Sequence, residues 1–226
     1  MSATAAVIVL LSVACGVLAV VCVALRRRLD LLEESSRQAL ADAAREVSGL
    51  EQGREDLERL SAIDPLTGIW NYRYLQTALQ SELESAERTG RSGAILMIDV
   101  DGFRRVNDAY GHQRGSAILR EIAQRLLLEV RHADTFARYG GEEFIVILPG
   151  TNAEGAARVA ERLCYAVRKT AFDDPADRSS GALQLTISIG GVVFPEHGTH
   201  GATLLRKADE HLTEAKRDSH GSWRIS

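Results

Sequence analysis

The spacing of apolar and polar residues divides the chain into three regions. Residues 1–28 contain an apolar run, from position 3 to position 25, that has no charged side chain. Over residues 29–63, leucine and alanine recur every three or four positions, which indicates a helix with one apolar seam. Over residues 64–226, helical periodicity alternates with strand-like apolar runs, as in a domain that packs helices on a sheet.

The third region is therefore expected to be an α/β sandwich with a mixed central sheet flanked by helices. Amphipathic periodicity predicts helices over residues 72–88, 115–130, 152–169 and 202–216. Runs rich in β-branched and aromatic residues predict strands over residues 94–100, 135–139, 144–148, 183–193 and 223–225. A polar loop is expected over residues 172–181.

The apolar run is long enough to cross a bilayer once, since about 20 apolar residues span the hydrocarbon core. Arg26, Arg27 and Arg28 follow it directly, and no basic residue precedes it. Because positive charges favour the cytoplasmic side, residues 1–28 are expected to be a single-pass membrane anchor with the remaining chain in the cytoplasm. A cleaved signal peptide, or a lipoprotein signal at Cys15, is the alternative, but each needs basic residues before the apolar run.

The second region predicts a helical stalk between the anchor and the domain. Residues 29–63 contain no proline, and their apolar spacing fits a two-stranded coiled coil, although serine, glutamate and glycine interrupt the seam. A single solvated linker helix is the alternative. Asp64-Pro65 ends the helical pattern, because a residue before proline disfavours helix.

Composition and charge are those of an ordinary globular protein and argue against one class of partner, nucleic acid. The chain is 45% hydrophobic and 26% charged, as in ordinary globular proteins. Its formal net charge of -4 argues against nucleic acid as a partner. Cys15, Cys22 and Cys164 show neither metal-ligand spacing nor a disulfide framework, which fits a reducing cytoplasm.

Two stretches carry candidate chemistry. Gly140-Gly141 joins two predicted strands and is expected to form a tight turn with positive φ, which leaves the backbone accessible to a phosphate. Glu142 and Glu143 follow it, and carboxylates beside a phosphate require a cation between them. By itself this stretch fits a metal–triphosphate site and a solvated surface hairpin equally well.

The second stretch is the apolar run of residues 94–100, which ends in acids at Asp99 and Asp101. An acid at the mouth of a buried strand must be hydrogen-bonded, paired or metal-bound. If this strand lies beside the hairpin, Asp99 and Glu142 can share a cation, which favours the metal–triphosphate interpretation.

Together these motifs resemble the GGDEF family of dinucleotide cyclases, in a Gly-Gly-Glu-Glu-Phe form. The other matching blocks, in chain order, are Asp64–Gly68, Asp99–Asp108, Gly111–Gly115, and Ala208–Asp209 with Ala215–Lys216. The resemblance covers residues 64–226 and implies a palm-like domain that condenses two GTP into cyclic di-GMP and two pyrophosphates. It further implies a homodimer, two Mg²⁺ or Mn²⁺ ions per active site, and a place in the inner membrane of a bacterium.

The resemblance also implies roles for individual residues. The metal ligands would be Asp99, Glu142 and the Val100 carbonyl, and the catalytic residues Glu142, Glu143 and Arg104. The substrate-binding residues would be Leu66, Gly102, Phe103, Asn107, His112, Ser116, Gly140, Gly141 and Lys216. Cyclic di-GMP would inhibit by binding Arg131, Asp134 and Arg162. The alternatives are an ordinary exposed helix lysine at Lys216 and an ordinary surface ion pair between Arg131 and Asp134.

Three positions depart from the family pattern. Ser116 stands where an aspartate usually accepts hydrogen bonds from guanine, and a hydroxyl also donates. Family members with serine there also make mixed cyclic GMP-AMP from GTP and ATP; the alternative is that Asn107 still selects guanine. His220 replaces a phosphate-binding arginine and Thr213 a tyrosine. A catalytically inactive cyclic-dinucleotide receptor is therefore a further alternative.

Overall fold

The computed structural model describes residues 26, 28, 62–172 and 182–226. The chain divides into two units, Met1–Leu60 and Ser61–Ser226, and each is considered by itself. The predicted anchor and nearly all of the predicted stalk lie outside the described residues, so both stay predictions. Among the helices of the described ranges, none combines the length and apolar character that a membrane span requires.

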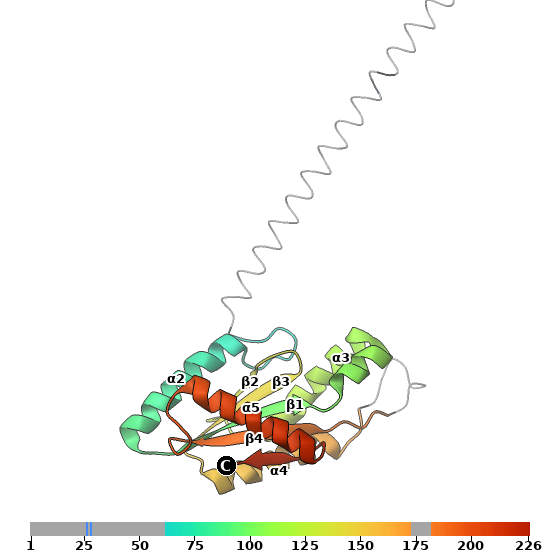
Figure 1. The fold of residues 1–226 in the computed structure, drawn as a ribbon. Coiled ribbons are helices and arrows are strands. Elements are labelled where there is room, and N and C mark those ends of the chain that lie inside the picture. Colours follow the sequence, from blue (N-terminus) through green and yellow to red (C-terminus); the bar gives the residue numbers. More distant parts are fainter. Residues whose placement is uncertain (1–25, 27, 29–61, 173–181) are drawn as a thin grey trace, which may run out of the picture. The chain divides into compact units, whose positions relative to one another are not determined.

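A five-stranded sheet in the order β2-β3-β1-β4-β5 organises the second unit (Figure 1). β1 (Gly93–Val100) lies at its centre, antiparallel to β3 (Glu143–Pro149) and to β4 (Ile187–Phe194). β2 (Thr135–Arg138) is antiparallel to β3, and β5 (Trp223–Ile225) is parallel to β4. The predicted mixed sheet is thus confirmed.

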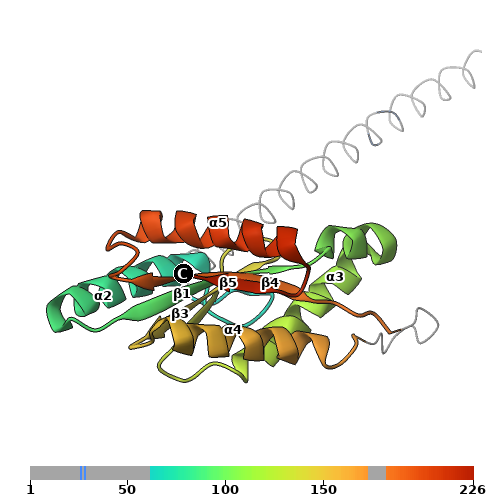
Figure 2. The same ribbon diagram turned by 60° about the horizontal axis from the view of Figure 1, so that its bottom comes forward.

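Helices cover both faces of this sheet (Figure 2). α3 (Phe103–Leu127) and α4 (Ala153–Arg168) pack on one face, while α2 (Tyr72–Thr89) and α5 (Gly201–Asp218) pack on the other. Alternate residues of β1 enter the two resulting cores, because successive side chains of a strand point to opposite faces. Every residue of β1 and β4 is buried, which explains their continuous apolar sequences.

Side-chain caps fix the starts of two helices. The Asn71 side chain accepts a hydrogen bond from the Tyr74 N–H, and the Asn152 side chain accepts one from the Gly155 N–H. α2 ends at Gly90, whose φ of 68° is left-handed. The predictions of helices at 72–88 and 152–169 are confirmed.

Two predicted boundaries are wrong. The strand expected at 183–193 begins only at Ile187, the register partner of Val100, because β1 ends there and Leu183 pairs with Phe172 instead. The helix expected at 115–130 begins at Phe103 and ends at Leu127, with a non-helical residue at Gly111 (φ 79°, ψ 162°). Its first half is mostly polar, so it shows little apolar periodicity.

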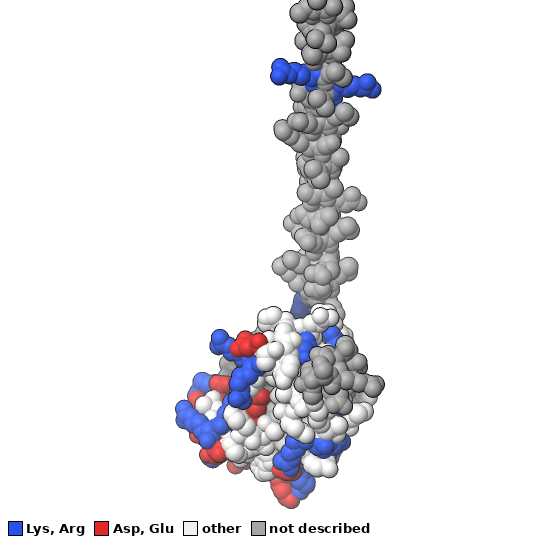
Figure 3. All heavy atoms as spheres, turned by 90° about the vertical axis from the view of Figure 1, so that its right-hand side faces the viewer, with Lys and Arg blue, Asp and Glu red and all other residues white. Residues whose placement is uncertain are grey.

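Charges of both signs share the surface. Figure 3 shows lysine and arginine standing among aspartate and glutamate on the described part of one face. Several such groups pair one turn apart on a helix, as Arg158 does with Glu154 and Arg206 with Glu210. Exposed pairs of this kind contribute little stability, so the fold depends on its two cores.

Gly190 marks the point where α5 lies closest to the sheet. A Cβ there would come within 2.1 Å of the Ala208 carbonyl oxygen and 2.2 Å of the Leu212 nitrogen. Since both are backbone atoms, we expect Gly190→Ala to lower the free energy of unfolding by roughly 2–3 kcal/mol, measured by urea denaturation. Gly141→Ala is the matched control, because its Cβ would meet no atom within 4 Å. Equal stability of Gly190→Ala and the parent protein would contradict this close approach.

Candidate functional site

The loop from Tyr139 to Glu142 joins β2 to β3. The N–H groups of Tyr139 and Gly140 both donate to the Glu143 carbonyl oxygen, at 2.9 and 3.2 Å. Neither Gly140 nor Gly141 has a positive φ, so the prediction of a tight turn with left-handed residues is wrong. The physical reason is that the loop is longer than such a turn and closes through backbone bonds to Glu143.

The Glu143 side chain lies against Gly140. A Cβ at this position would lie 2.4 Å from a carboxylate oxygen of Glu143. Because that oxygen is the far end of a flexible side chain, a larger residue at position 140 would require Glu143 to shift. Gly141, by contrast, has open space around its Cα and leaves the backbone accessible to a bulky group.

A salt bridge locks the hairpin to the start of the domain. Arg138 Nη1 lies 3.2 Å from each carboxylate oxygen of Asp64, and both side chains are largely buried. The same guanidinium donates to the carbonyl oxygens of Gly140 and Gly141, at 3.1 and 2.7 Å. One arginine thus connects the loop to Asp64 at the start of the domain. Sequence reasoning missed this pair, because nothing in the sequence shows that residues 74 positions apart face each other.

Three carboxylate residues converge at the end of β1. Asp99 is the register partner of Glu143, and the Val100 N–H donates to the Glu142 carbonyl oxygen at 3.3 Å. Burial raises the pKa of Asp99, and it likewise raises the pKa of Glu142 and of Glu143. The nearby charge of Asp99 raises the pKa of both glutamates further. The strand and hairpin are therefore neighbours, as the shared-cation hypothesis requires.

Lys216 on α5 stands beside this acidic group. Its Nζ lies 2.7 Å from Asp99 Oδ1, and the Asp99 side chain is only 12% exposed. Burial nevertheless outweighs the attraction of Lys216, because the pKa of Asp99 stays raised. The ammonium occupies a position where a cation is electrostatically favoured.

The donor set fits a hard divalent cation. Carboxylate and carbonyl oxygens are the ligands that Mg²⁺ and Mn²⁺ prefer. Within the described ranges, no three acidic, histidine or cysteine side chains are already arranged as a metal cage. A cation held by Asp99 would lie close to the Lys216 ammonium.

Asp101 has a different surrounding from Asp99. Its carboxylate accepts hydrogen bonds from Thr186 Oγ1 (2.6 Å), Ser188 Oγ (2.7 Å) and the Gly221 N–H (2.8 Å). His220 Nδ1 lies 3.2 Å from it, and the Asp101 side chain is only 5% exposed. This buried carboxylate joins the end of β1 to β4 and to the turn between α5 and β5. The sequence reveals the acid but none of its partners.

The start of α3 carries the predicted phosphate contacts. Gly102 precedes the helix with a left-handed φ of 69°, and its N–H and that of Phe103 belong to the helix start, where free amides favour anions. The Arg104 side chain is 90% exposed, and its Nε lies 3.9 Å from Asp108. Arg104 is therefore free to move toward a substrate.

The predicted base-recognition residues are only partly brought together. A Cβ at Gly115 would lie 2.0 Å from Asn107 Oδ1, so the glycine allows Asn107 to cross the break in α3. Ser116 follows this contact and is half-buried, whereas His112 is exposed. Leu66 is half-buried and packs against one core.

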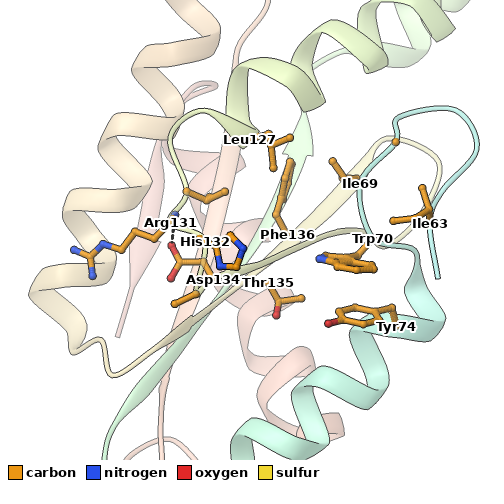
Figure 4. A pocket seen from close by; sticks show the side chains of 13 residues that line it. Ile63, Ile69, Trp70, Tyr74, Leu127, Arg131, His132, Asp134, Thr135 and Phe136 are labelled. Atoms are coloured by element: carbon orange, nitrogen blue, oxygen red, sulfur yellow. Dashed lines mark hydrogen bonds between the residues drawn. The ribbon is translucent and has the colours of Figure 1, made fainter.

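Two of the predicted inhibitory residues, Arg131 and Asp134, lie in a separate turn before β2, whereas Arg162 lies on α4. The Arg131 N–H donates to Asp134 Oδ2 at 2.7 Å, so the carboxylate bonds backbone rather than guanidinium. Arg162 instead contacts Glu129, with Nε 3.1 Å from Oε2. A cavity of about 630 Å³ adjoins the turn, and Figure 4 shows the Arg131 side chain directed away from its Trp70 wall. The structure thus joins Arg131 and Asp134 by a hydrogen bond, while Arg162 forms its ion pair with Glu129.

Comparison with known proteins agrees with this geometry. Residues 61–222 match the family model described as "Diguanylate cyclase, GGDEF domain". Diguanylate cyclase DosC of Escherichia coli is 38% identical over 168 residues, which cover 73% of this chain and 36% of DosC. The chain thus spans less than half the length of such curated relatives.

Two solved structures share the fold. Diguanylate cyclase SiaD of Pseudomonas aeruginosa, in complex with its activator SiaC, has a TM-score of 0.68 and 32% identity, covering 99% of this chain and 86% of that one. The coiled coil and GGDEF domain of DgcB from Caulobacter crescentus, in complex with c-di-GMP, has a TM-score of 0.69 and 26% identity. That match covers 85% of this chain and 100% of the DgcB chain.

The raised carboxyl pKa values predict how stability depends on pH. Ordinary values are 3.8 for aspartate and 4.5 for glutamate, so the folded state holds protons more tightly than the unfolded chain. Without divalent metal, the contribution of these groups to stability should be greatest at low pH and be lost as pH rises through the raised values. A bound cation removes the repulsion, so stabilisation by Mg²⁺ or Mn²⁺ should increase over the same interval.

Thermal unfolding from about pH 4 to pH 8, with EDTA or with Mg²⁺, tests this expectation. Glu142→Gln should flatten the pH dependence in EDTA and lose most of the Mg²⁺-induced rise in Tm. Exposed Glu87 provides the control, since Glu87→Gln should leave both unchanged. A full Mg²⁺ response in Glu142→Gln would remove Glu142 from the metal site.

Proposed function

The chain belongs to the GGDEF-domain family of diguanylate cyclases, and on that premise we propose that it condenses two GTP into cyclic di-GMP and two pyrophosphates. One observation carries the proposal: Asp99, Glu142 and Glu143 converge at the end of β1, beside the open Gly140–Gly141 loop. The alternative, an ordinary surface hairpin, does not explain why these three acidic residues lie together.

In the proposed reaction, the 3′-hydroxyl of each GTP attacks the α-phosphorus of the other, and pyrophosphate leaves each time. Asp99, Glu142 and the Val100 carbonyl would hold Mg²⁺ or Mn²⁺, with two ions in each active site. When bound, these ions supply charge neutralisation at the α-phosphoryl oxygens and acidify the attacking hydroxyl. The raised pKa of Glu142 suits it to accept the hydroxyl proton, and Glu143 would support the second metal ion.

The remaining residues position the nucleotide. The N–H groups of Gly102 and Phe103 bind phosphate oxygens, and the mobile Arg104 approaches the developing charge. Lys216, which contacts Asp99 in the structure, would bind the triphosphate.

The base pocket is proposed at the break in α3, between Asn107 before it and Ser116 after it. Asn107 and Ser116 contact the edge of the base, His112 lies at the rim, and Leu66 forms an apolar wall. The approach of Asn107 to Gly115 supports this arrangement.

Assembly and location follow from the same proposal. Each domain holds one nucleotide and the reaction joins two, so two domains must face each other in a homodimer. The predicted stalk, residues 29–63, and the predicted single-pass anchor, residues 1–28, would tether both copies to the inner membrane of a bacterium and raise their effective concentration.

Purified protein with GTP and Mg²⁺ should release pyrophosphate and form cyclic di-GMP. Glu142→Ala should lower the rate by at least about a hundredfold. Mutating a residue that only hydrogen-bonds to a metal ligand already lowers metal affinity or activity about 10- to 100-fold, and Glu142 is proposed to be a ligand itself. Glu87→Ala, on the exposed side of α2, should retain full activity. A folded dimer that binds cyclic di-GMP but releases no pyrophosphate would instead identify an inactive receptor.

Ser116 leads to a separate prediction, which concerns the choice between GTP and ATP as substrate. Its hydroxyl can donate to adenine N1, where a carboxylate would place negative charge, so equal GTP and ATP should yield some cyclic GMP-AMP. Ser116→Asp should increase guanine preference about tenfold or more, since a bidentate base contact is worth roughly 1–3 kcal/mol. Mass spectrometry of the products measures both. Pure cyclic di-GMP under ATP excess would leave guanine selection to Asn107.

Product inhibition tests the Arg131 turn. The exposed guanidinium can bind a guanine edge or phosphate while Asp134 accepts from the base, so Arg131→Ala should raise the inhibitory concentration of cyclic di-GMP about tenfold. Arg120→Ala, an exposed arginine on α3, is the control and should not change it. If inhibition of Arg131→Ala matches the parent protein, the turn is an ordinary surface feature.

A further inference from the structure

A second cavity, of about 370 Å³, lies between the first half of α3 and the chain segment that leads into β4. It is bounded at one end by Gly102, where the proposed phosphate contacts begin, and by Asp101 and His220. Tyr110 and Gln184 contribute polar groups to its walls. The cavity therefore adjoins the proposed phosphate contacts at Gly102, while most of its lining residues have no role in that proposal.

Arg105 is the cationic side chain of this cavity that lies nearest the phosphate contacts. Its guanidinium occupies the space beside Gly102, since a Cβ on Gly102 would lie 2.7 Å from Nη2 and 3.1 Å from Nε. No carboxylate of the described ranges forms a salt bridge with Arg105, whereas neighbouring Arg104 lies near Asp108. Arg105 is thus an uncommitted guanidinium, held against the backbone that is proposed to bind phosphate.

The other cation-forming side chain of the cavity is committed elsewhere. His220 Nδ1 contacts the buried carboxylate of Asp101, which also binds the Gly221 N–H of the same turn. Asp101 holds this histidine through the ring nitrogen that faces it. Of the two groups, only Arg105 carries a permanent charge that is free for a ligand.

We propose that Arg105 binds the terminal phosphates of the nucleotide and is a further substrate-binding residue of this site; the proposal rests on the proposed function. A triphosphate whose α-phosphate lies at the metal ligands and whose oxygens reach the Gly102 N–H brings its tail beside Arg105. The planar guanidinium can donate two parallel hydrogen bonds to a phosphate. Arg105 would leave Gly102 by rotating side-chain bonds alone, since it breaks no salt bridge within the described residues.

Binding of a non-condensable α,β-methylene analogue of GTP tests this role directly. With the full-length protein and Mg²⁺, Arg105→Ala should weaken analogue binding about tenfold, as expected for a charge-assisted hydrogen bond. Binding of guanosine monophosphate, which lacks the terminal phosphates, should change less than about twofold. Arg105→Lys should recover part of the loss, and the effect should diminish at high salt.

Two controls separate binding from folding. Arg120→Ala removes an exposed arginine further along α3 and should leave analogue binding unchanged. In the Arg105→Ala background, His220→Arg introduces a second guanidinium into the same cavity and should restore analogue binding. In turnover assays, Arg105→Ala should raise KM for GTP about tenfold with kcat little changed, because the contact positions the substrate.

The outcomes distinguish this inference from the proposed function. Equal weakening of analogue and monophosphate binding, or no weakening at all, overturns the role of Arg105. Failure of the parent protein to bind the analogue overturns it as well. If the parent protein binds the analogue through Arg105 but forms no cyclic dinucleotide, the inference stands and the cyclase proposal fails.

Discussion

The site depends on two carboxylates, two residues apart, that the fold uses in opposite ways. Asp101 is buried and has four polar partners, so it fixes the end of β1 to β4 and to the turn after α5. A charge this deep is tolerated only with such partners. Because Asp101 holds the strand end in place, Asp99 can remain incompletely neutralised there. The raised pKa of Asp99 reflects that state.

Three polar contacts thus hold the segments of the acidic group together against the repulsion between their carboxylates. Asp101 secures β4 and the turn, the Arg138–Asp64 salt bridge secures the hairpin, and Lys216 secures α5. Each tie joins segments that are distant in sequence. Removal of one partner would leave a buried charge unpaired, which costs more than the pair contributes when intact.

Much of the fold follows from the sequence, because burial imposes patterns that can be recognised. The continuous apolar runs of β1 and β3 reveal central strands, and amphipathic periodicity reveals α2 and α4. The first half of α3 could not be found in this way, since its few buried residues give no periodic signal. Likewise, the sequence predicts a left-handed backbone at Gly140 that the structure does not have, and only coordinates show that Glu143 lies against this glycine.

Candidate site residues could be identified from motifs, but their present partners could not. The sequence suggests that Asp99 binds a metal and that Lys216 binds a triphosphate, as two separate functions. In the structure these residues bind each other. A divalent cation at Asp99 would compete with this ammonium for the same carboxylate, so the two proposed roles would not be independent.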